Sequence, residues 1–114
     1  MINLKTSRKS EHLIIVSAKL TFKATAEGGK SNPIRSGYRP NHCFEKLENN
    51  KNPGFYIGEV QFNDKEFIYP GETSIVTVIF LKAGDIEKHL TPGRRWYVYE
   101  VPQLVAEGEI LHLE

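Results

Sequence analysis

The chain has 114 residues, a formal net charge of +1 and 39% hydrophobic residues, which is the composition of one globular domain. This length is too short for the doubly wound sheet that normally carries a phosphate-binding loop and its magnesium ligand. The single cysteine, Cys43, excludes an internal disulfide and a metal site built from several cysteines, and it favours a reducing compartment such as the cytoplasm.

Charge is distributed unevenly along the chain. Residues 1–51 contain ten Lys and Arg against four acidic residues, whereas residues 52–114 contain five against ten. The two halves therefore carry net charges of +6 and −5. An asymmetry of this kind predicts an anion-binding face, unless the two sets of charges interleave in the folded chain.

The first element in chain order is a polar, charged N-terminal tail, predicted for residues 1–12. From Leu13 to Ala24, apolar and polar residues alternate, which predicts a half-buried strand. The segment ATAEGGKS, residues 24–31, is close to a phosphate-binding loop, but Pro33, Gly37 and Pro40 follow it and forbid the helix that such a loop requires. We therefore predict a long ordered loop over residues 27–40 and no nucleotide.

The rest of the chain predicts further short strands separated by turns. The expected strands are 42–48, 55–62, 73–81, 94–100 and 104–113, with one helical turn within 82–93. No apolar run approaches the length of a membrane span. About six strands without a long helix predict an all-β fold, a single small antiparallel six-stranded β-barrel covering residues 13–114.

The sequence offers little for catalysis. His42 and Cys43 are adjacent in an expected strand and so point to opposite faces, which disfavours a thiol nucleophile activated by this histidine. Glu107 and Glu109 share an outer face about 7 Å apart, but simple polar alternation accounts for them. We expect neither an enzyme nor a metal or other cofactor, because no metal-ligand spacing links the cysteine to the remaining histidines, His12, His89 and His112.

Four short blocks carry a resemblance to a known family. They are EGG (27–29), SGYRP (36–40), YPGE (69–72) and GRRWYVYE (93–100). In order and approximate spacing they resemble the C-terminal β-barrel of elongation factor Tu, over residues 13–114. The resemblance implies a barrel of the translation-factor C-terminal domain type, without the GTPase domain and the middle barrel. In that family the domain contacts the T stem of aminoacyl-tRNA, packs on the GTPase domain, contacts the nucleotide-exchange factor and carries no catalytic residue.

The resemblance also implies candidate binding residues. The polar residue that follows G-Y-R-P in the family falls on Asn41, a threonine of the next strand falls near Asn50, and a glutamate falls on Glu100. Each of these side chains can hydrogen-bond to a ribose, and the asparagine amides can also donate to a phosphate.

The predicted loop adds three basic candidates, Lys30, Arg35 and Arg39. Arg35 and Arg39 flank Tyr38, and guanidinium groups beside an aromatic ring suit phosphate binding and base stacking. Arg39 has a structural alternative, in which it braces the barrel through carbonyl groups or a carboxylate.

Two departures from the family pattern keep two functions open. The glycine pair that follows the glutamate in the family is replaced by Val101 and Pro102, which removes a place where an RNA backbone approaches closely. The arginine before the glutamate is replaced by Tyr99. Our first hypothesis is a non-enzymatic module that binds tRNA. The alternative is a protein-interaction module that mimics elongation factor Tu and occupies or decoys one of its partners.

Overall fold

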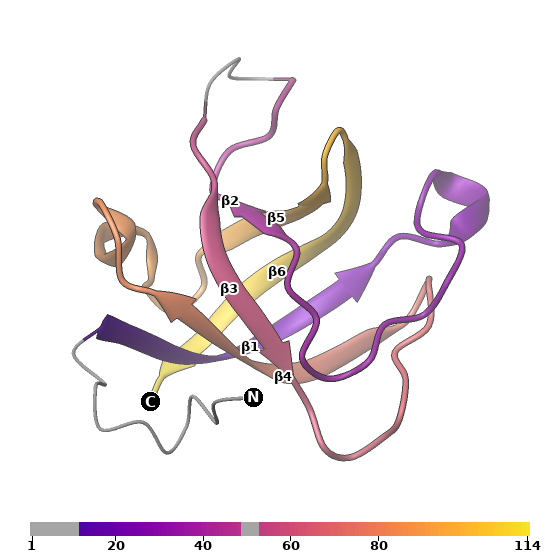
Figure 1. Cartoon of the computed structure of the whole chain (residues 1–114), viewed down its shortest axis with the longest axis horizontal. Coiled ribbons are helices and arrows are strands. Elements are labelled where there is room, and N and C mark those ends of the chain that lie inside the picture. The colour runs from indigo at the N-terminus through magenta and orange to yellow at the C-terminus, as the bar shows by residue number, and fades with distance from the viewer. Residues whose placement is uncertain (1–11, 49–52) are drawn as a thin grey trace.

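The computed structural model describes residues 12–48 and 53–114, which fold into one closed barrel (Figure 1). Every neighbouring pair of strands is antiparallel, and the order around the barrel is β1-β4-β3-β2-β5-β6. The predicted all-β, six-stranded antiparallel barrel is thereby confirmed. The strands are β1 Leu13–Phe22, β2 Asn41–Cys43, β3 Tyr56–Gln61, β4 Thr73–Leu81, β5 Arg95–Glu100 and β6 Gln103–Leu113.

The predicted tail overlaps the described chain only at His12. The carbonyl oxygen of His12 accepts a hydrogen bond of 2.9 Å from the backbone N–H of Lys82, so it continues the pairing of β1 with β4. Residues 1–11 lie outside the described residues. None of the helices in the described ranges is long or apolar enough to cross a membrane.

Alternation along the strands fills the barrel. On β1 the side chains of Val16, Ala18 and Leu20 are fully buried, whereas Lys19 and Thr21 between and after them are exposed. The largest fully buried side chains are Trp96 and Phe80, which meet edge to face with their ring centroids 6.0 Å apart. Large rings in the centre allow a six-stranded barrel to close around a packed interior rather than a channel.

β2 is shorter than the strand that the sequence predicts over residues 42–48. After Cys43 the backbone leaves the ladder, because side chains take over its hydrogen bonds. The guanidinium of Arg94 donates to the carbonyl of Phe44, and the N–H of Leu47 donates to the hydroxyl of Tyr99. The helical turn expected within residues 82–93 is confirmed as a short 3-10 helix, η4 Ile86–His89.

The long loop predicted over residues 27–40 is ordered by two isolated bridges. Ile34 pairs with Ile68, and Tyr38 pairs with Val60 of β3. A short 3-10 helix, η3 Thr25–Glu27, overlaps the first residue of the predicted loop, and no helix follows Ser31 through the described residues up to 48. The chain therefore lacks the geometry of a phosphate-binding loop at this place.

Candidate functional site

The loop after η3 brings Lys30 to Glu100, 70 residues away at the end of β5. The ammonium Nζ of Lys30 lies 2.5 Å from Oε2 of Glu100, and the hydroxyl of Tyr38 donates to the same oxygen. Nζ also lies 5.5 Å from the centroid of the Tyr38 ring. Two of the predicted site residues, Lys30 and Glu100, are therefore in contact, and Tyr38 of the same loop contacts both of them.

In this loop cluster of Lys30, Tyr38 and Glu100, the charged groups have their partners within the cluster. Burial and the hydrogen bond to Glu100 raise the pKa of Tyr38, so its hydroxyl stays protonated and donates. Burial alone would raise the pKa of Glu100, but the hydrogen bonds from Lys30 and Tyr38 outweigh it and lower that pKa. Only 16% of the Lys30 side chain is exposed. Lys30 is therefore committed to a carboxylate rather than presented to solvent.

Arg35 is more available than Lys30. It forms an ion pair of 3.0 Å with Glu66, and both side chains are 68% exposed. Pairs this exposed contribute about 0–1 kcal/mol, so the guanidinium can exchange partners. A hollow of about 310 Å³ lies beside it and is lined by residues of the same loop: Lys30, Pro33, Ile34, Arg35, Ser36, Gly37 and Tyr38.

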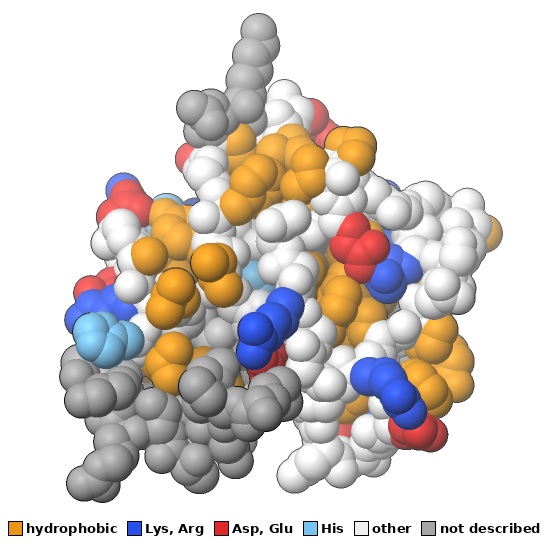
Figure 2. Space-filling view, in the orientation of Figure 1, with side chains coloured by type: hydrophobic (Ala, Val, Ile, Leu, Met, Phe, Trp, Pro, Cys, Tyr) orange, Lys and Arg blue, Asp and Glu red, His pale blue; other side chains and the backbone are white. Residues whose placement is uncertain are grey.

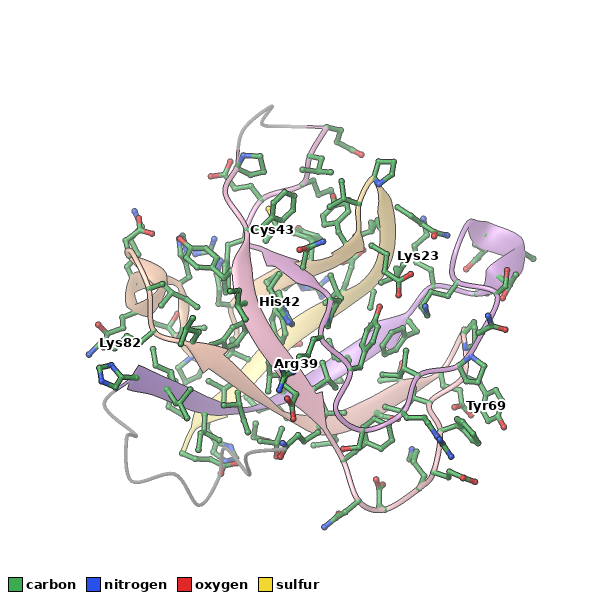
Figure 3. All side chains as sticks on the ribbon, in the orientation of Figure 1. Lys23, Arg39, His42, Cys43, Tyr69 and Lys82 are labelled. Atoms are coloured by element: carbon green, nitrogen blue, oxygen red, sulfur yellow. The ribbon has the colours of Figure 1, made fainter. Side chains whose placement is uncertain are left out.

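Arg39 adopts the structural alternative that the sequence left open. Its Nε and Nη2 atoms both lie 2.7 Å from Oε1 of Glu59 on β3, whose side chain is only 4% exposed. The other carboxylate oxygen, Oε2, accepts a hydrogen bond of 2.7 Å from Gln61. A buried carboxylate needs this compensation, so Arg39 braces the loop against β3. Figure 3 shows Arg39 at the face of the barrel that β3 crosses.

Asn41 lies in a row of outward-facing side chains that crosses five strands. It pairs with Tyr99 of β5 on one side and with Ile57 of β3 on the other. Gly58 pairs with Phe80, so continuing that register by one residue places Ile57 beside Leu81, and Leu81 pairs with Leu13. We call these five residues the apolar row: Tyr99, Asn41, Ile57, Leu81 and Leu13.

The apolar row presents hydrophobic surface in its middle. Ile57 is 65% exposed and Leu81 is 39% exposed, and Phe55, just before β3, is 42% exposed. Figure 2 shows hydrophobic side chains gathering on the face where Figure 1 places β3 and the end of β4. Contiguous exposed apolar side chains on a small domain mark an interaction surface.

Sequence reasoning did not predict the apolar row. The signal was present in the run TSIVTVIFL, residues 73–81, where apolar residues occupy both faces of a strand instead of alternating. Its inward positions Val76, Val78 and Phe80 fill the core, which leaves Ile79 and Leu81 on the outer face. A strand that is apolar on both sides needs cover on its second face. Asn50, the remaining predicted site residue, lies outside the described residues.

The other chemistry considered from the sequence is structural. His42 points into the barrel, where its Nδ1 accepts a hydrogen bond from the indole of Trp96 (Figure 3). Cys43 is buried, its thiol donates to the carbonyl of Glu45, and burial raises the pKa of the thiol. A protonated thiol is a poor nucleophile. Within residues 12–48 and 53–114, no three His, Cys, Asp or Glu side chains form a group that could hold a metal ion.

No known family model matches the chain, and no curated protein matches it either.

Proposed function

We propose that this barrel is a non-enzymatic binding module whose partner is a protein that docks on the apolar row. The observation that carries the proposal is the exposure of Ile57, 65%, in the centre of a row that also includes Leu81. Burying side chains of this kind supplies about 25 cal/mol for each Å² of apolar surface removed from water. Asn41 lies next to Ile57 in the same row and offers an amide group for orientation.

The charges around the loop favour a protein over RNA. Nucleic-acid binding depends on cations that can replace the counterions of phosphates. Lys30 is engaged by Glu100, and Arg39 is engaged by the buried Glu59. Arg35 is the one of these three predicted cations whose carboxylate partner, Glu66, is as exposed to solvent as the arginine itself. A surface with this pairing attracts phosphates weakly, whereas its apolar row suits a protein.

The resemblance supports a narrower form of the proposal. If the chain is a free-standing relative of the C-terminal barrel of elongation factor Tu, its partner is a protein that recognises that barrel, and the module mimics the factor to occupy or decoy that partner. A cytoplasmic location is part of the same proposal, since the single thiol of Cys43 is unpaired and buried.

Site-specific crosslinking tests the proposal. A photoreactive amino acid at position 57 should capture one discrete protein from the native host extract, and the same group at position 75 should not. Ile75 is the matched control, because it is also an exposed isoleucine, 57%, at the other end of β4. The Ile57→Asp variant should lose the captured protein, and Ile75→Asp should keep it. Equal capture at both positions, or none at position 57, would count against a protein partner on this row.

Binding of tRNA is the second candidate, and one observation favours it. Lys30, Arg35 and Tyr38 line one hollow of about 310 Å³, with Ser36 beside them. Fluorescence anisotropy with charged and uncharged tRNA, from low to physiological salt, decides between the candidates. Saturable binding that survives physiological salt and weakens in Arg35→Ala would favour RNA. Binding that disappears with salt would leave the protein partner as the better account.

A further inference from the structure

A second hollow lies across the barrel from β3, the strand that carries Ile57 at the centre of the apolar row. In the order β1-β4-β3-β2-β5-β6, β6 is three strands away from β3 in both directions. The hollow has a volume of about 320 Å³ and lies over β6, between β1, β5 and η3. Six charged side chains line it: Lys19, Lys23 and Arg95, with Glu27, Glu107 and Glu109.

The charges of this hollow are balanced in number. Cross-strand pairing places Glu109 of β6 between Lys19 of β1 and Arg95 of β5. Glu107 lies two residues earlier on the same face of β6, and Lys23 follows the end of β1 (Figure 3). A simple anion entering here meets three carboxylates, and a simple cation meets three positive groups. A ligand that carries both signs avoids either repulsion.

The charges are balanced but they are not hydrogen-bonded to one another. Lys19 lies 3.7 Å from Glu109, and Arg95 lies 4.0 Å from Glu107. Both distances exceed that of a charge-assisted hydrogen bond, about 2.7–2.9 Å. The contrast within the molecule is clear, because the Lys30 to Glu100 and Arg39 to Glu59 pairs lie at 2.5 and 2.7 Å.

Two further groups of the hollow have no ion-pair partner among the described residues, namely Lys23 and Glu27. Lys23 is partly buried as a residue, and its Nζ lies beside Gly28, 3.8 Å from the position that a Cβ at Gly28 would take. An ammonium group without an ion-pair partner is available to a bound carboxylate, and a charge-assisted hydrogen bond between them is a strong one. Glu27, at the end of η3, offers the matching acceptor for a positive group.

We propose that this hollow binds a small dipolar ion, a molecule with an ammonium and a carboxylate group such as a free amino acid or a dipeptide. Its volume lies at the lower end of the range for small-molecule sites, about 300–1,000 Å³. Lys23 and Lys19 bind the carboxylate, and Glu27 and Glu107 bind the ammonium group. This site is independent of the apolar row and of any partner that docks there.

The test is a titration of the ¹⁵N-labelled full chain, followed by the amide shifts of the six charged residues. L-alanine and glycylglycine are the dipolar probes, and they distinguish an amino acid from a dipeptide by the separation of their charges. Acetate and methylammonium carry one charge each. We expect saturable shifts with at least one dipolar probe. Saturation by acetate or methylammonium with the same midpoint, or no saturation with either dipolar probe, would overturn the proposal.

Variants locate the binding. Lys23→Ala and Glu27→Gln should each weaken the binding of the dipolar probe by about tenfold, since each removes a hydrogen bond to a charged group. Both positions are only partly buried or exposed, so the fold is retained. Arg35 lines the other hollow, which is formed by the loop of residues 27–40. Arg35→Ala is therefore the matched control and should leave the midpoint of the titration unchanged. Unchanged midpoints in Lys23→Ala and Glu27→Gln would also overturn the proposal.

Discussion

The indole N–H of Trp96 donates a hydrogen bond of 3.1 Å to Nδ1 of His42 in the interior of the barrel. Nε2 of His42 lies 3.1 Å from the carbonyl oxygen of Gly58. Because Nδ1 accepts, the proton of the neutral imidazole is on Nε2, which donates to Gly58. One buried side chain thereby joins β2 to β5 and β3, and burial lowers its pKa to about 4.

The first prediction is that the barrel loses stability in mild acid through His42. The unfolded histidine titrates near 6.5, whereas the folded one titrates near 4, so between these values the unfolded chain binds the extra proton. The free energy of unfolding therefore falls as the pH decreases from 6.5 towards 4, by at most about 1.4 kcal/mol per pH unit. Urea unfolding at a series of pH values, followed by the fluorescence of Trp96, measures this slope.

His42→Gln should flatten the slope, because glutamine keeps hydrogen-bonding groups but does not titrate. His112→Gln changes an exposed histidine at the end of β6 and should leave the slope as in the wild-type chain. Parallel curves for the wild-type chain and His42→Gln would contradict the assignment of this slope to His42.

The second prediction separates two arginines that look alike in the sequence. Arg39→Ala leaves the carboxylate of Glu59, 4% exposed, without its counter-charge and should cost about 3 kcal/mol of stability. Arg35→Ala breaks an exposed pair and should cost less than about 1 kcal/mol. Chemical denaturation of both variants gives the comparison. The double variant Arg39→Ala with Glu59→Gln should recover part of the loss, and a loss equal to that of Arg39→Ala alone would argue against the buried charge as its cause.

The sequence predicted the fold well because the alternation of apolar and polar residues along a strand can be read from neighbouring residues alone. Burial alternates with a period of two from Val16 to Phe22, and the turns around Pro70 and Pro92 separate the strands. The short β2 was not predictable in the same way. Its end depends on a guanidinium and a hydroxyl that reach the backbone from residues 50 and 52 positions away.

The candidate site was predicted only in part for the same reason. Lys30 and Glu100 were each proposed, but the 2.5 Å contact that neutralises them arises from barrel closure over 70 residues. A charge counted in the sequence says nothing of its partner, so the carboxylates that pair with Lys30, Arg35 and Arg39 could not be identified from the composition. The outward exposure of Ile57 depends likewise on which residues its neighbours on β2 and β4 present.

The third prediction concerns the shared carboxylate of the loop cluster. Glu100→Gln leaves the ammonium of Lys30, 16% exposed, without an anion and should destabilise the chain by about 1 kcal/mol at neutral pH, since Glu100 itself is 38% exposed. The pKa of Glu100 is lowered in the folded chain, so its contribution is complete above the unfolded value of 4.5 and is lost as the pH falls through the folded value.

The difference in unfolding free energy between the wild-type chain and Glu100→Gln should therefore be largest near pH 7 and should shrink in acid. Glu87→Gln is the control, because Glu87 is 66% exposed and lies 3.7 Å from Lys82. A difference for Glu100→Gln that stays constant from pH 7 to acid would contradict an ionised role for this carboxylate.

The fourth prediction tests how tightly Trp96 fills the barrel. Gly108 pairs with Trp96 across β6 and β5, and a Cβ at position 108 would lie 2.6 Å from two atoms of the indole, Cη2 and Cζ3. Gly108→Ala should therefore cost about 2–3 kcal/mol through overpacking. Those atoms belong to the outer, benzene ring of the indole. The shorter side chain of phenylalanine does not reach their positions, so in the Trp96→Phe background the same substitution should cost less than about 1 kcal/mol. Thermal unfolding followed by circular dichroism measures all four chains of the cycle, and equal costs in the two backgrounds would show that the indole does not impose the glycine.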